Sequence, residues 1–487
     1  MEKGKNVLAI DLGASSGRAI LGSFDGERIK LEELHRFLNE PVQLNQTLYW
    51  DILRLMHDIK IGLQKAAQVT FHSIGIDTWG VDFGLLDEDG NLLENPIHYR
   101  DKRTEGMFEL AFSLYDKERF YELSGNQFME INTIFQLLSL KKSRKALLSQ
   151  AKTLLLMPDL LNYFLTGVKV SEYSIASTTQ MLDAKEKAWS KEIIQSLGLS
   201  ESILTTIIEP GTVLSPIRKE ILDELMIKPA NVVAVAGHDT QCAMVAVPAK
   251  EDDFLFLSCG TWSLFGTELL EPIISEKSKQ YNMTNEGGYG GKISFLKNII
   301  GLWLIQESRR HWAREGLSYT FAELEKEAQK ALPFKAFIDP EAPEFVAPGN
   351  IPERIRDYCQ RTNQDIPQEI GECVRLINES LALKYRYVME QIEDCTQKSY
   401  DTIYMVGGGT KSRMLCQMTA NACKKKVVAG PTEATVYGNV ALQLIALGKI
   451  SDIANARECI RNSEEMICYE PQEKDKWEEA YQRFLTL

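Results

Sequence analysis

The sequence predicts an α/β protein made of two similar domains, and three observations support this fold class. Strand-like and helix-like hydrophobic periods alternate along the 487 residues. Two apolar runs flank a turn of small residues in residues 7–24, and again in residues 254–269. Turns rich in glycine or other small residues directly follow strands in both halves. We therefore expect one domain in residues 1–247 and a second in residues 248–487, facing each other across a cleft.

The first half contains most of the predicted elements. Residues 7–10 and 19–22 form the strands of the first hairpin. Apolar residues at helical spacing predict a helix over residues 51–67, and a strand follows at 72–87. Residues 103–188 are mostly helical in pattern. A strand at 231–237 then precedes a short helix that ends before Pro248.

The second half begins with the hairpin of residues 254–269. A helical pattern covers residues 367–393, and Pro367 suits the first turn of that helix. Residues 401–423 predict a strand, a turn of three glycines (residues 407–409) and a helix. The free N–H groups of that helix would suit a nucleotide, although packing is the better explanation of such a turn taken alone.

The first hairpin turn has chemistry of its own. Between Asp11 and Arg18 the turn consists only of glycine, alanine and serine. Small side chains let a ligand approach the backbone, and exposed N–H groups in a turn bind anions such as phosphate. Asp11 beside such a turn could hold Mg²⁺. The alternative is an ordinary tight hairpin with an acid at its surface.

The stretch AGHDT is the strongest single candidate for catalysis. His238 and Asp239 lie between an apolar strand and a helix, where ligand sites form in α/β sheets. A carboxylate fixed there suits the general base for an alcohol, whereas the alternative is a helix N-cap. His238 either donates a hydrogen bond to a hydroxylated substrate or makes a local structural bond.

Composition narrows the classes of function. The formal net charge of −13 argues against a nucleic-acid or anionic-membrane surface. The first residues enter a strand without a long apolar leader, so we expect a cytoplasmic protein. Nine cysteines without a CxxC pair predict reduced thiols, although Cys359 and Cys373 could pair. No GxxxxGK[ST] motif occurs and no GxGxxG follows the first strand, so P-loop and Rossmann folds are poor matches.

Nine stretches, in order along the chain, resemble the FGGY family of carbohydrate kinases. They are AIDLGASSGR, SIGIDTWGVDF, YRDKRT, LLMPD, AGHDT, SCGTWSL, TNEGG, KNIIGLWLIQ and VGGGTKS. They run from residue 9 to about residue 412, and DTWGVDF differs from what the xylulokinases and glycerol kinases of the family have there. The resemblance implies two actin-like ATPase (ribonuclease H-like) domains.

The resemblance also implies a set of site residues. On the ATP side it implies Ala14, Ser15, Ser16, Gly17, Arg18, Thr261, Gln306 and Gly408, with Asp11 near the metal. On the sugar side it implies Gly80, His238, Asp239, Thr240 and Asn298, with Asp239 as proton acceptor. Trp79, Asp82 and Tyr99 are further sugar contacts to consider, but core packing explains them better.

The reaction implied is transfer of the γ-phosphoryl group of ATP, with Mg²⁺, to the 1-hydroxyl of a ketose. L-rhamnulose is the expected sugar, and L-fuculose or L-xylulose are the alternatives. The expected partners are these small molecules alone, in a monomer or small homo-oligomer. Two other classes stay open, a chaperone-like or filament-forming ATPase and a non-catalytic sugar sensor.

Overall fold

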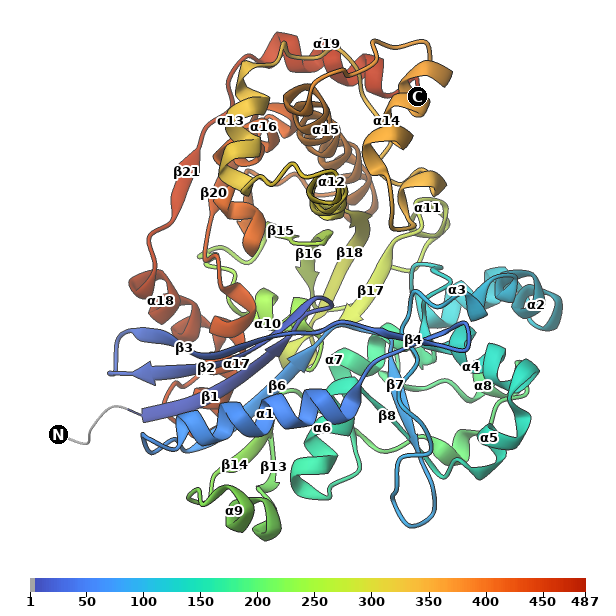
Figure 1. Ribbon diagram of the computed structural model, residues 1–487, viewed down its shortest axis with the longest axis vertical. Coiled ribbons are helices and arrows are strands. Elements are labelled where there is room, and N and C mark those ends of the chain that lie inside the picture. The colour runs from blue at the N-terminus through green and yellow to red at the C-terminus, as the bar shows by residue number, and fades with distance from the viewer. Residues whose placement is uncertain (1–4) are drawn as a thin grey trace. The chain divides into compact units, whose positions relative to one another are not determined.

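A computed structural model describes residues 5–487 of the chain (Figure 1). Residues 1–4 lie outside the described residues. The chain forms two compact units that are not continuous in sequence. Unit 1 contains the chain up to Ala246 together with Leu269–Phe295 and Ala434–Ser463, and unit 2 contains Val247–Glu268, Leu296–Glu433 and Glu464–Leu487. The division into domains at residue 247 remains a prediction.

The central sheet of unit 1 has the strand order β13-β14-β6-β1-β2-β3. Its strands are β1 (Lys5–Leu12), β2 (Ser16–Phe24), β3 (Ile29–Leu38), β6 (Ser73–Thr78), β13 (Thr212–Pro216) and β14 (Asn231–Ala234). β1 pairs antiparallel with β2 and parallel with β6, so the first predicted hairpin is confirmed. The predicted strand 72–87 is divided, because β6 ends at Thr78 and β7 (Phe83–Leu86) belongs to another sheet.

One face of this sheet is covered by α1 (Ile52–Ala66) and α6 (Met157–Thr166) (Figure 1). Side chains alternate along a strand, so Leu8 and Ile10 join the apolar core that these helices complete. The predicted helix over residues 51–67 is confirmed, and the Asp51 side chain caps it by accepting from the N–H of Arg54.

The other face of the sheet is bound to α17 (Ala434–Ala446) through buried polar side chains. Asn439 donates to the Asp77 carboxylate over 2.6 Å, and Gln443 donates to the carbonyl of Leu8 over 3.0 Å. α17 also packs closely on α10 (Asp239–Val245), because a Cβ on Gly438 would lie 1.8 Å from the carbonyl oxygen of Cys242. Residues near the carboxyl ends of β1 and β6 are therefore held by α17 from this side.

A second apolar core in unit 1 gathers residues between Phe83 and Ile203. The remaining elements of unit 1 are α2 (Met107–Leu114), α3 (Lys117–Ser124), α4 (Thr133–Ser143), α5 (Lys145–Gln150), α7 (Tyr173–Ala176), α8 (Lys191–Ser196), α9 (Lys219–Leu225), α11 (Glu276–Gln280), α18 (Ile453–Ser463), β4 (Val42–Leu44), β5 (Thr47–Tyr49), β8 (Thr153–Leu156), β9 (Ser171–Glu172), β10 (Leu182–Asp183), β11 (Ala188–Trp189), β12 (Ile207–Ile208) and β17 (Thr284–Gly287). The mostly helical pattern predicted for residues 103–188 is confirmed.

The sheet of unit 2 repeats the topology of unit 1. The strands of this seven-stranded sheet that lie wholly or mostly in unit 2 are β15 (Leu255–Cys259), β16 (Trp262–Leu269), β18 (Ile293–Ile300), β19 (Thr402–Val406), β20 (Lys426–Ala429) and β21 (Ile467–Tyr469). β15 pairs antiparallel with β16 and parallel with β19, as β1 does with β2 and β6. The second predicted hairpin is therefore confirmed, and so is the similarity of the two halves.

The helices of unit 2 correct two details of the sequence analysis. They are α12 (Trp303–Arg314), α13 (Phe321–Lys330), α14 (Ile351–Arg361), α15 (Ile370–Thr396), α16 (Arg413–Cys423) and α19 (Lys474–Phe484). α15 begins after Pro367, because Glu369 and Glu372 form a capping box there. The three glycines do not open α16 directly. A short 3₁₀ turn (Gly408–Lys411) follows them, and Ser412 caps the helix.

Two expectations based on composition can be compared with the described residues. All nine cysteines are free thiols, including Cys359 and Cys373, as the preference for reduced thiols predicted. Within residues 5–487, no helix combines the length and the apolar character needed to cross a membrane.

Candidate functional site

The turn between β1 and β2 presents backbone N–H groups. Asn39 donates from its side chain to the carbonyl of Gly13 over 2.9 Å and from its N–H to the carbonyl of Ser15 over 3.2 Å. The N–H of Gly13 donates to the carbonyl of Ser16 over 2.9 Å. These bonds occupy carbonyls, whereas no partner among the described residues accepts from the N–H of Ala14 or Ser15. The turn therefore has the donors of an anion-binding nest.

Packing explains one glycine of this turn but not the other. A Cβ on Gly17 would lie 2.3 Å from the ring of Phe37, so no larger residue fits there. At Gly13 the nearest atom to such a Cβ would be the carbonyl oxygen of Ser16 at 3.5 Å, which is ordinary contact. Gly17 is thus required by the core of the sheet, and the open part of the turn lies between Gly13 and Ser16.

Two carboxyl groups lie side by side where β1 and β6 end. Asp11 is paired with Asp77 in the strand register, and the guanidinium of Arg18 contacts the Asp11 carboxylate. Asp77 Oδ2 accepts the bond from Asn439. Asp77 Oδ1 is buried and has no hydrogen-bond partner in the described part of the chain. Burial, and next the negative charge of Asp11, raise the pKa of Asp77 well above its ordinary range.

The unpartnered oxygen of Asp77 beside Asp11 fits a cation. Among the described residues, no group of three or more His, Cys, Asp or Glu side chains is arranged to hold a metal on its own. Mg²⁺ keeps several waters and is commonly held by one or two carboxylates together with substrate phosphates. The pair Asp11 and Asp77 next to an anion-binding turn has the composition of such a site.

The turn between β14 and α10 presents His238 and Asp239. His238 is the N-cap residue of α10 and Asp239 is its first residue, so the N-cap interpretation of Asp239 is wrong. The Asp239 side chain keeps 32% of its surface accessible, which leaves the carboxylate within reach of a substrate. Burial of the surrounding turn raises the pKa of Asp239, His238 opposes this shift, and Asp11 adds to it. Thr240 donates from its hydroxyl to Asp239 over 3.2 Å.

Three backbone hydrogen bonds fix this turn from outside. The N–H of Gly237 donates to Glu172 Oε2 over 2.8 Å, and the N–H of His238 donates to the hydroxyl of Ser174 over 3.2 Å. The carbonyl of Gly237 accepts from the N–H of Thr78 over 2.9 Å. The position of Asp239 therefore depends on a buried glutamate in β9, far away in sequence.

The predicted sugar contact Gly80 lies in a strained turn between β6 and β7. Val81 has φ of +66°, a conformation rare for a β-branched residue. Its N–H donates to the Thr178 hydroxyl over 3.1 Å, and its carbonyl accepts from the Thr133 hydroxyl over 2.6 Å. A Cβ on Gly80 would lie 3.3 Å from a methyl carbon of Thr178. The surroundings thus hold this turn in one conformation.

Asp82 organises the core beside that turn. Its carboxylate accepts from the indole N–H of Trp50 over 2.6 Å and of Trp79 over 3.0 Å, and from the N–H of Tyr99 and the amide of Gln136. Asp82, Trp79 and Tyr99 are all buried, which is consistent with the preference for packing over sugar contact. Burial raises the pKa of Asp82 to about 6. With four donors on a buried carboxylate, Asp82 is not available as a general base.

In unit 2 two of the predicted nucleotide residues contact each other. Thr261, between β15 and β16, donates from its hydroxyl to the side-chain oxygen of Gln306 on α12 over 3.1 Å. The carbonyl of Thr261 accepts from the N–H of Trp303 over 3.1 Å, which fixes the start of α12 against the hairpin turn. Asn298 lies on β18 and is half-buried.

The three glycines after β19 have different causes. Gly407 has φ of +84°, and a Cβ on Gly409 would lie 2.2 Å from the Cys259 sulfur, so conformation and packing require both. A Cβ on Gly408 would have nothing within 4 Å. Gly408 is therefore the glycine of this turn that leaves open space. It lies next to the end of β15, the strand before Thr261.

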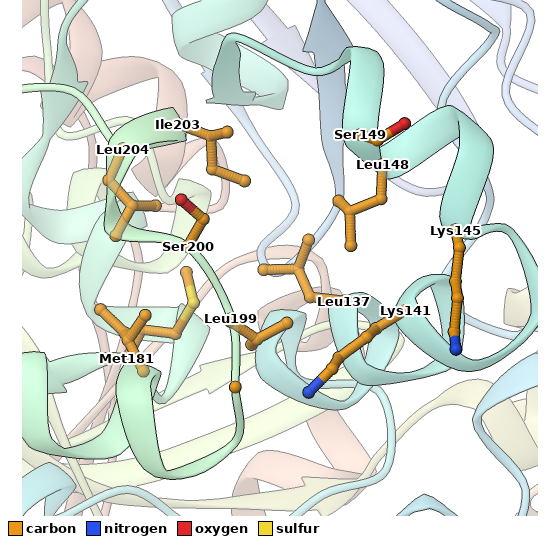
Figure 2. A pocket seen from close by; sticks show the side chains of 12 residues that line it. Leu137, Lys141, Lys145, Leu148, Ser149, Met181, Leu199, Ser200, Ile203 and Leu204 are labelled. Atoms are coloured by element: carbon orange, nitrogen blue, oxygen red, sulfur yellow. The ribbon is translucent and has the colours of Figure 1, made fainter.

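Unit 1 also contains an apolar pocket of about 250 Å³ between α4, α5 and the segment after α8 (Figure 2). Leucine side chains such as Leu137 and Leu148 line it, and the ammonium groups of Lys141 and Lys145 lie at one side. Lys141 donates to the carbonyl of Leu197 over 2.8 Å. None of the predicted site residues lines this pocket, so it is separate from the carboxylates described above.

Three acidic residues of the site have no assigned role in the sequence analysis. Asp77 and Glu286 lie inside the quoted stretches SIGIDTWGVDF and TNEGG, so the motifs contain them without indicating what they contact. Glu172 lies outside every motif. Its one local signal is that it precedes a helix, where it caps α7 through the N–H groups of Ser174 and Ile175.

The two similar sheets, and the carboxylates of Asp11 and Asp77 side by side at the strand ends, fit one class of protein. This class is the two-unit α/β kinases of small molecules. Models of the FGGY family of carbohydrate kinases match residues 6–246 with the N-terminal domain and residues 255–447 with the C-terminal domain. The chain belongs to the FGGY family of carbohydrate kinases. It is an ATP-dependent sugar kinase, as the sequence analysis predicted.

Individual relatives and structures are similar over nearly the whole chain. The rhamnulokinase of Bacteroides thetaiotaomicron is 41% identical over 482 residues, covering 99% of each chain. The rhamnulokinase of Oceanobacillus iheyensis is 42% identical over 464 residues, covering 95% of this chain and 97% of the relative. The xylulose kinase structure from Lactobacillus acidophilus has a TM-score of 0.82 at 18% identity and covers 99% and 97% of the two chains. The Plasmodium falciparum glycerol kinase structure has a TM-score of 0.78 at 15% identity, covering 99% and 98%. These two structures support the fold alone.

Proposed function

We propose that this kinase transfers the γ-phosphoryl group of ATP to the 1-hydroxyl of L-rhamnulose, giving L-rhamnulose 1-phosphate and ADP. One observation carries the choice of sugar, namely the 41% identity to a curated rhamnulokinase over 99% of both chains. The stretch DTWGVDF supports the same choice, because it differs from what the xylulokinases and glycerol kinases of the family have there. L-fuculose and L-xylulose are the alternatives.

The chemistry we infer needs one base and one set of donors. The Asp239 carboxylate takes the proton of the sugar hydroxyl while that oxygen forms a bond to the γ-phosphorus. The bond from the γ-phosphorus to the bridging oxygen breaks, and ADP leaves with that electron pair. Phosphoryl transfer requires positioning and charge stabilisation above all, which suits a carboxylate with 32% of its surface accessible.

The proposed ligand contacts follow from the two strand-end turns. In unit 1 the N–H groups of the turn from Ala14 to Arg18 bind phosphate oxygens. In unit 2 Thr261, Gln306 and Gly408 bind the nucleotide, supported by the Thr261–Gln306 contact and the open space at Gly408. His238, Thr240, Gly80 and Asn298 bind the sugar. Mg²⁺, held by Asp11 with phosphate oxygens, would neutralise charge that develops during transfer.

Other properties remain predictions from sequence. They are the two domains at 1–247 and 248–487, the cytoplasmic location, the lack of nucleic-acid and membrane partners, and a monomer or small homo-oligomer.

A coupled assay of ADP release over a panel of sugars tests the proposal. We expect L-rhamnulose to give the highest kcat/KM of the panel, which also includes L-fuculose, L-xylulose, D-xylulose, glycerol and the aldose L-rhamnose. ATP turnover without sugar should be low, because no substrate hydroxyl is then positioned between the base and the γ-phosphorus. A preference for another ketose would overturn the substrate. Rapid sugar-independent hydrolysis would instead favour a motor-like ATPase.

Replacing Asp11 tests the metal assignment. In Asp11→Ala we expect impaired turnover and a Mg²⁺ dependence shifted to higher concentration, because one carboxylate of the proposed pair is gone. L-rhamnulose binding measured by calorimetry without nucleotide should stay near that of the wild type. Asp58→Ala is the matched control, since it removes a buried carboxylate of the same unit that contacts His35 and Arg54 and none of the site residues. An unchanged metal titration in Asp11→Ala would make the Asp11–Arg18 pair purely structural.

A further inference from the structure

The imidazole of His238 lies between two carboxylates of unit 1. Its Nδ1 is 3.1 Å from Oε2 of Glu286, and its Nε2 is 3.5 Å from Oδ1 of Asp239. The Nδ1 contact is a charge contact and not a well-aligned hydrogen bond. Glu286, His238 and Asp239 therefore form a carboxylate–imidazole–carboxylate row that ends at the proposed base.

The Glu286 carboxylate is itself held in place. The amide of Gln241, on the first turns of α10, donates to Glu286 Oε2 over 3.2 Å. The hydroxyl of Ser294 donates to the other side of that amide over 2.8 Å, which fixes its orientation. Glu286 lies on β17, where the N–H of the following residue donates to the hydroxyl of Ser177 over 2.8 Å. The carboxylate is 4% exposed, so bulk water does not screen it from the ring.

Every charged group that faces the ring favours a proton on it. These groups are Glu286 on β17, Asp239 on α10 and Glu172 on β9. Burial alone would favour the neutral ring, but the three carboxylates outweigh it and raise the pKa of His238. With a proton on each ring nitrogen, Nδ1 faces the Glu286 carboxylate at 3.1 Å and Nε2 faces the Asp239 carboxylate at 3.5 Å.

We propose that Glu286 is a positioning residue for phosphoryl transfer, which holds the His238 ring so that its Nε2–H faces the Asp239 carboxylate. The inference rests on the proposed function, because it assigns Asp239 as the base. The partial burial of Asp239 and the nearby charge of Asp11 both disfavour its charged form. The positive charge of His238, on the side of Asp239 Oδ1, opposes them and leaves Oδ2 for the sugar hydroxyl. Glu286 acts through the ring and does not contact the substrate.

The variant Glu286→Gln removes the charge and keeps the shape. We expect kcat to fall about 10-fold to 100-fold, because a misplaced catalytic group costs up to about 10²-fold. The KM for L-rhamnulose should change much less, because the sugar contacts remain. The acid limb of the kcat profile should move to higher pH. Without the Glu286 carboxylate the His238 ring loses its proton more readily. The positive charge of that ring is nearer to Asp239 than the Glu286 carboxylate is, so the pKa of Asp239 rises.

Asp58→Asn is the matched control for loss of a buried carboxylate. Asp58 is 2% exposed and lies 3.1 Å from Nε2 of His35, so it forms the same kind of pair at the same distance. It belongs to α1 and contacts none of the residues in the row. This variant should lower Tm and leave kcat, KM and the pH profile as in the wild type. If Glu286→Gln lowers Tm in the same way and changes nothing else, the proposal is wrong.

A double variant tests whether Glu286 acts through His238. The loss in kcat of Glu286→Gln combined with His238→Gln should equal that of His238→Gln alone, whereas multiplied losses would contradict the proposal. If Glu286→Gln does not fold, the protonation of the His238 ring in the wild type still tests the proposal. The chain has six histidines, so comparison with His238→Gln assigns the ¹⁵N signals of the ring. A ring with protons on both nitrogens at neutral pH is expected, and an unprotonated Nε2 would overturn the proposal.

The two proposals fail in different ways. If the wild type phosphorylates no sugar of the panel, the proposed function fails, whatever the state of the His238 ring. If the wild type phosphorylates L-rhamnulose and Glu286→Gln has wild-type kcat and pH profile, the role of Glu286 alone fails.

Discussion

Asp239→Asn should lower kcat by about 10²-fold to 10⁴-fold while the thermal midpoint stays at the wild-type value. The amide keeps the shape of the side chain and loses the proton acceptor. A fall in kcat of this size is typical when a general base is removed. The fold should tolerate the change, because His238 and not Asp239 is the N-cap of α10. The bond from the Thr240 hydroxyl can still be accepted by the amide oxygen.

The same preparation should be used to measure kcat, Tm and ADP affinity. ADP affinity should persist, since the turns at Ala14 and Gly408 are unchanged. Asp51→Asn is the matched control, because Asp51 truly caps a helix of the same unit and Asn caps about as well. Near-normal kcat in Asp239→Asn would place the base elsewhere. Asp82 would not be the replacement, since four donors already occupy its buried carboxylate.

The hairpins could be predicted from sequence because their signals are local. Two apolar runs around a turn of small residues define β1 with β2, and β15 with β16, and both are found where expected. The turn AGHDT could be predicted for the same reason, since an apolar strand followed by a short helix can be recognised from about ten consecutive residues. The repeated sheet order was not visible, because the two halves share topology without sharing residues.

Contacts between distant segments could not be predicted in this way. Asn439 and Gln443 come from a helix that follows most of unit 2 in sequence, and yet they bond Asp77 and Leu8 in unit 1. A polar pair four residues apart on a helix is ordinarily a solvated face. The roles of Glu172 and Glu286 are similarly hidden, because each depends on a partner more than 40 residues away.

Local backbone conformation is a third reason why the observed elements differ from those predicted from the sequence. The interruption of the strand at Trp79 to Asp82 follows from Val81 in a left-handed conformation, which a valine gives no reason to expect. The start of α15 depended on a choice between Pro367 and the Glu369 capping box, and the capping box determined it. In both places tertiary hydrogen bonds or caps outweighed the intrinsic preference of the residue.

Glu172→Gln should lower the free energy of unfolding by about 3 kcal/mol and kcat by about tenfold or more. The carboxylate accepts four hydrogen bonds. Oε2 receives the Ser174 hydroxyl at 2.6 Å, the N–H of Gly237 at 2.8 Å and the N–H of Ile175 at 3.1 Å, and Oε1 receives the N–H of Ser174 at 2.7 Å. A glutamine places an NH₂ group against at least one of these donors. The Gly237 anchor of the base-bearing turn then weakens, so stability and turnover fall together.

The pH dependence of unfolding separates this prediction from a general packing defect. Burial raises the pKa of Glu172 from 4.5 to about 7 in the folded protein. The folded state therefore binds the proton more tightly, and Glu172 makes the wild type lose stability as pH rises from about 4.5 to about 7. Denaturant unfolding at pH 5 and pH 8 should show a smaller decrease in Glu172→Gln, which lacks this titration. Exposed Glu192→Gln is the control and should keep the wild-type slope. Equal slopes in wild type and Glu172→Gln would mean that Glu172 is already ionised at pH 5, and normal kcat would mean that the turn does not need it.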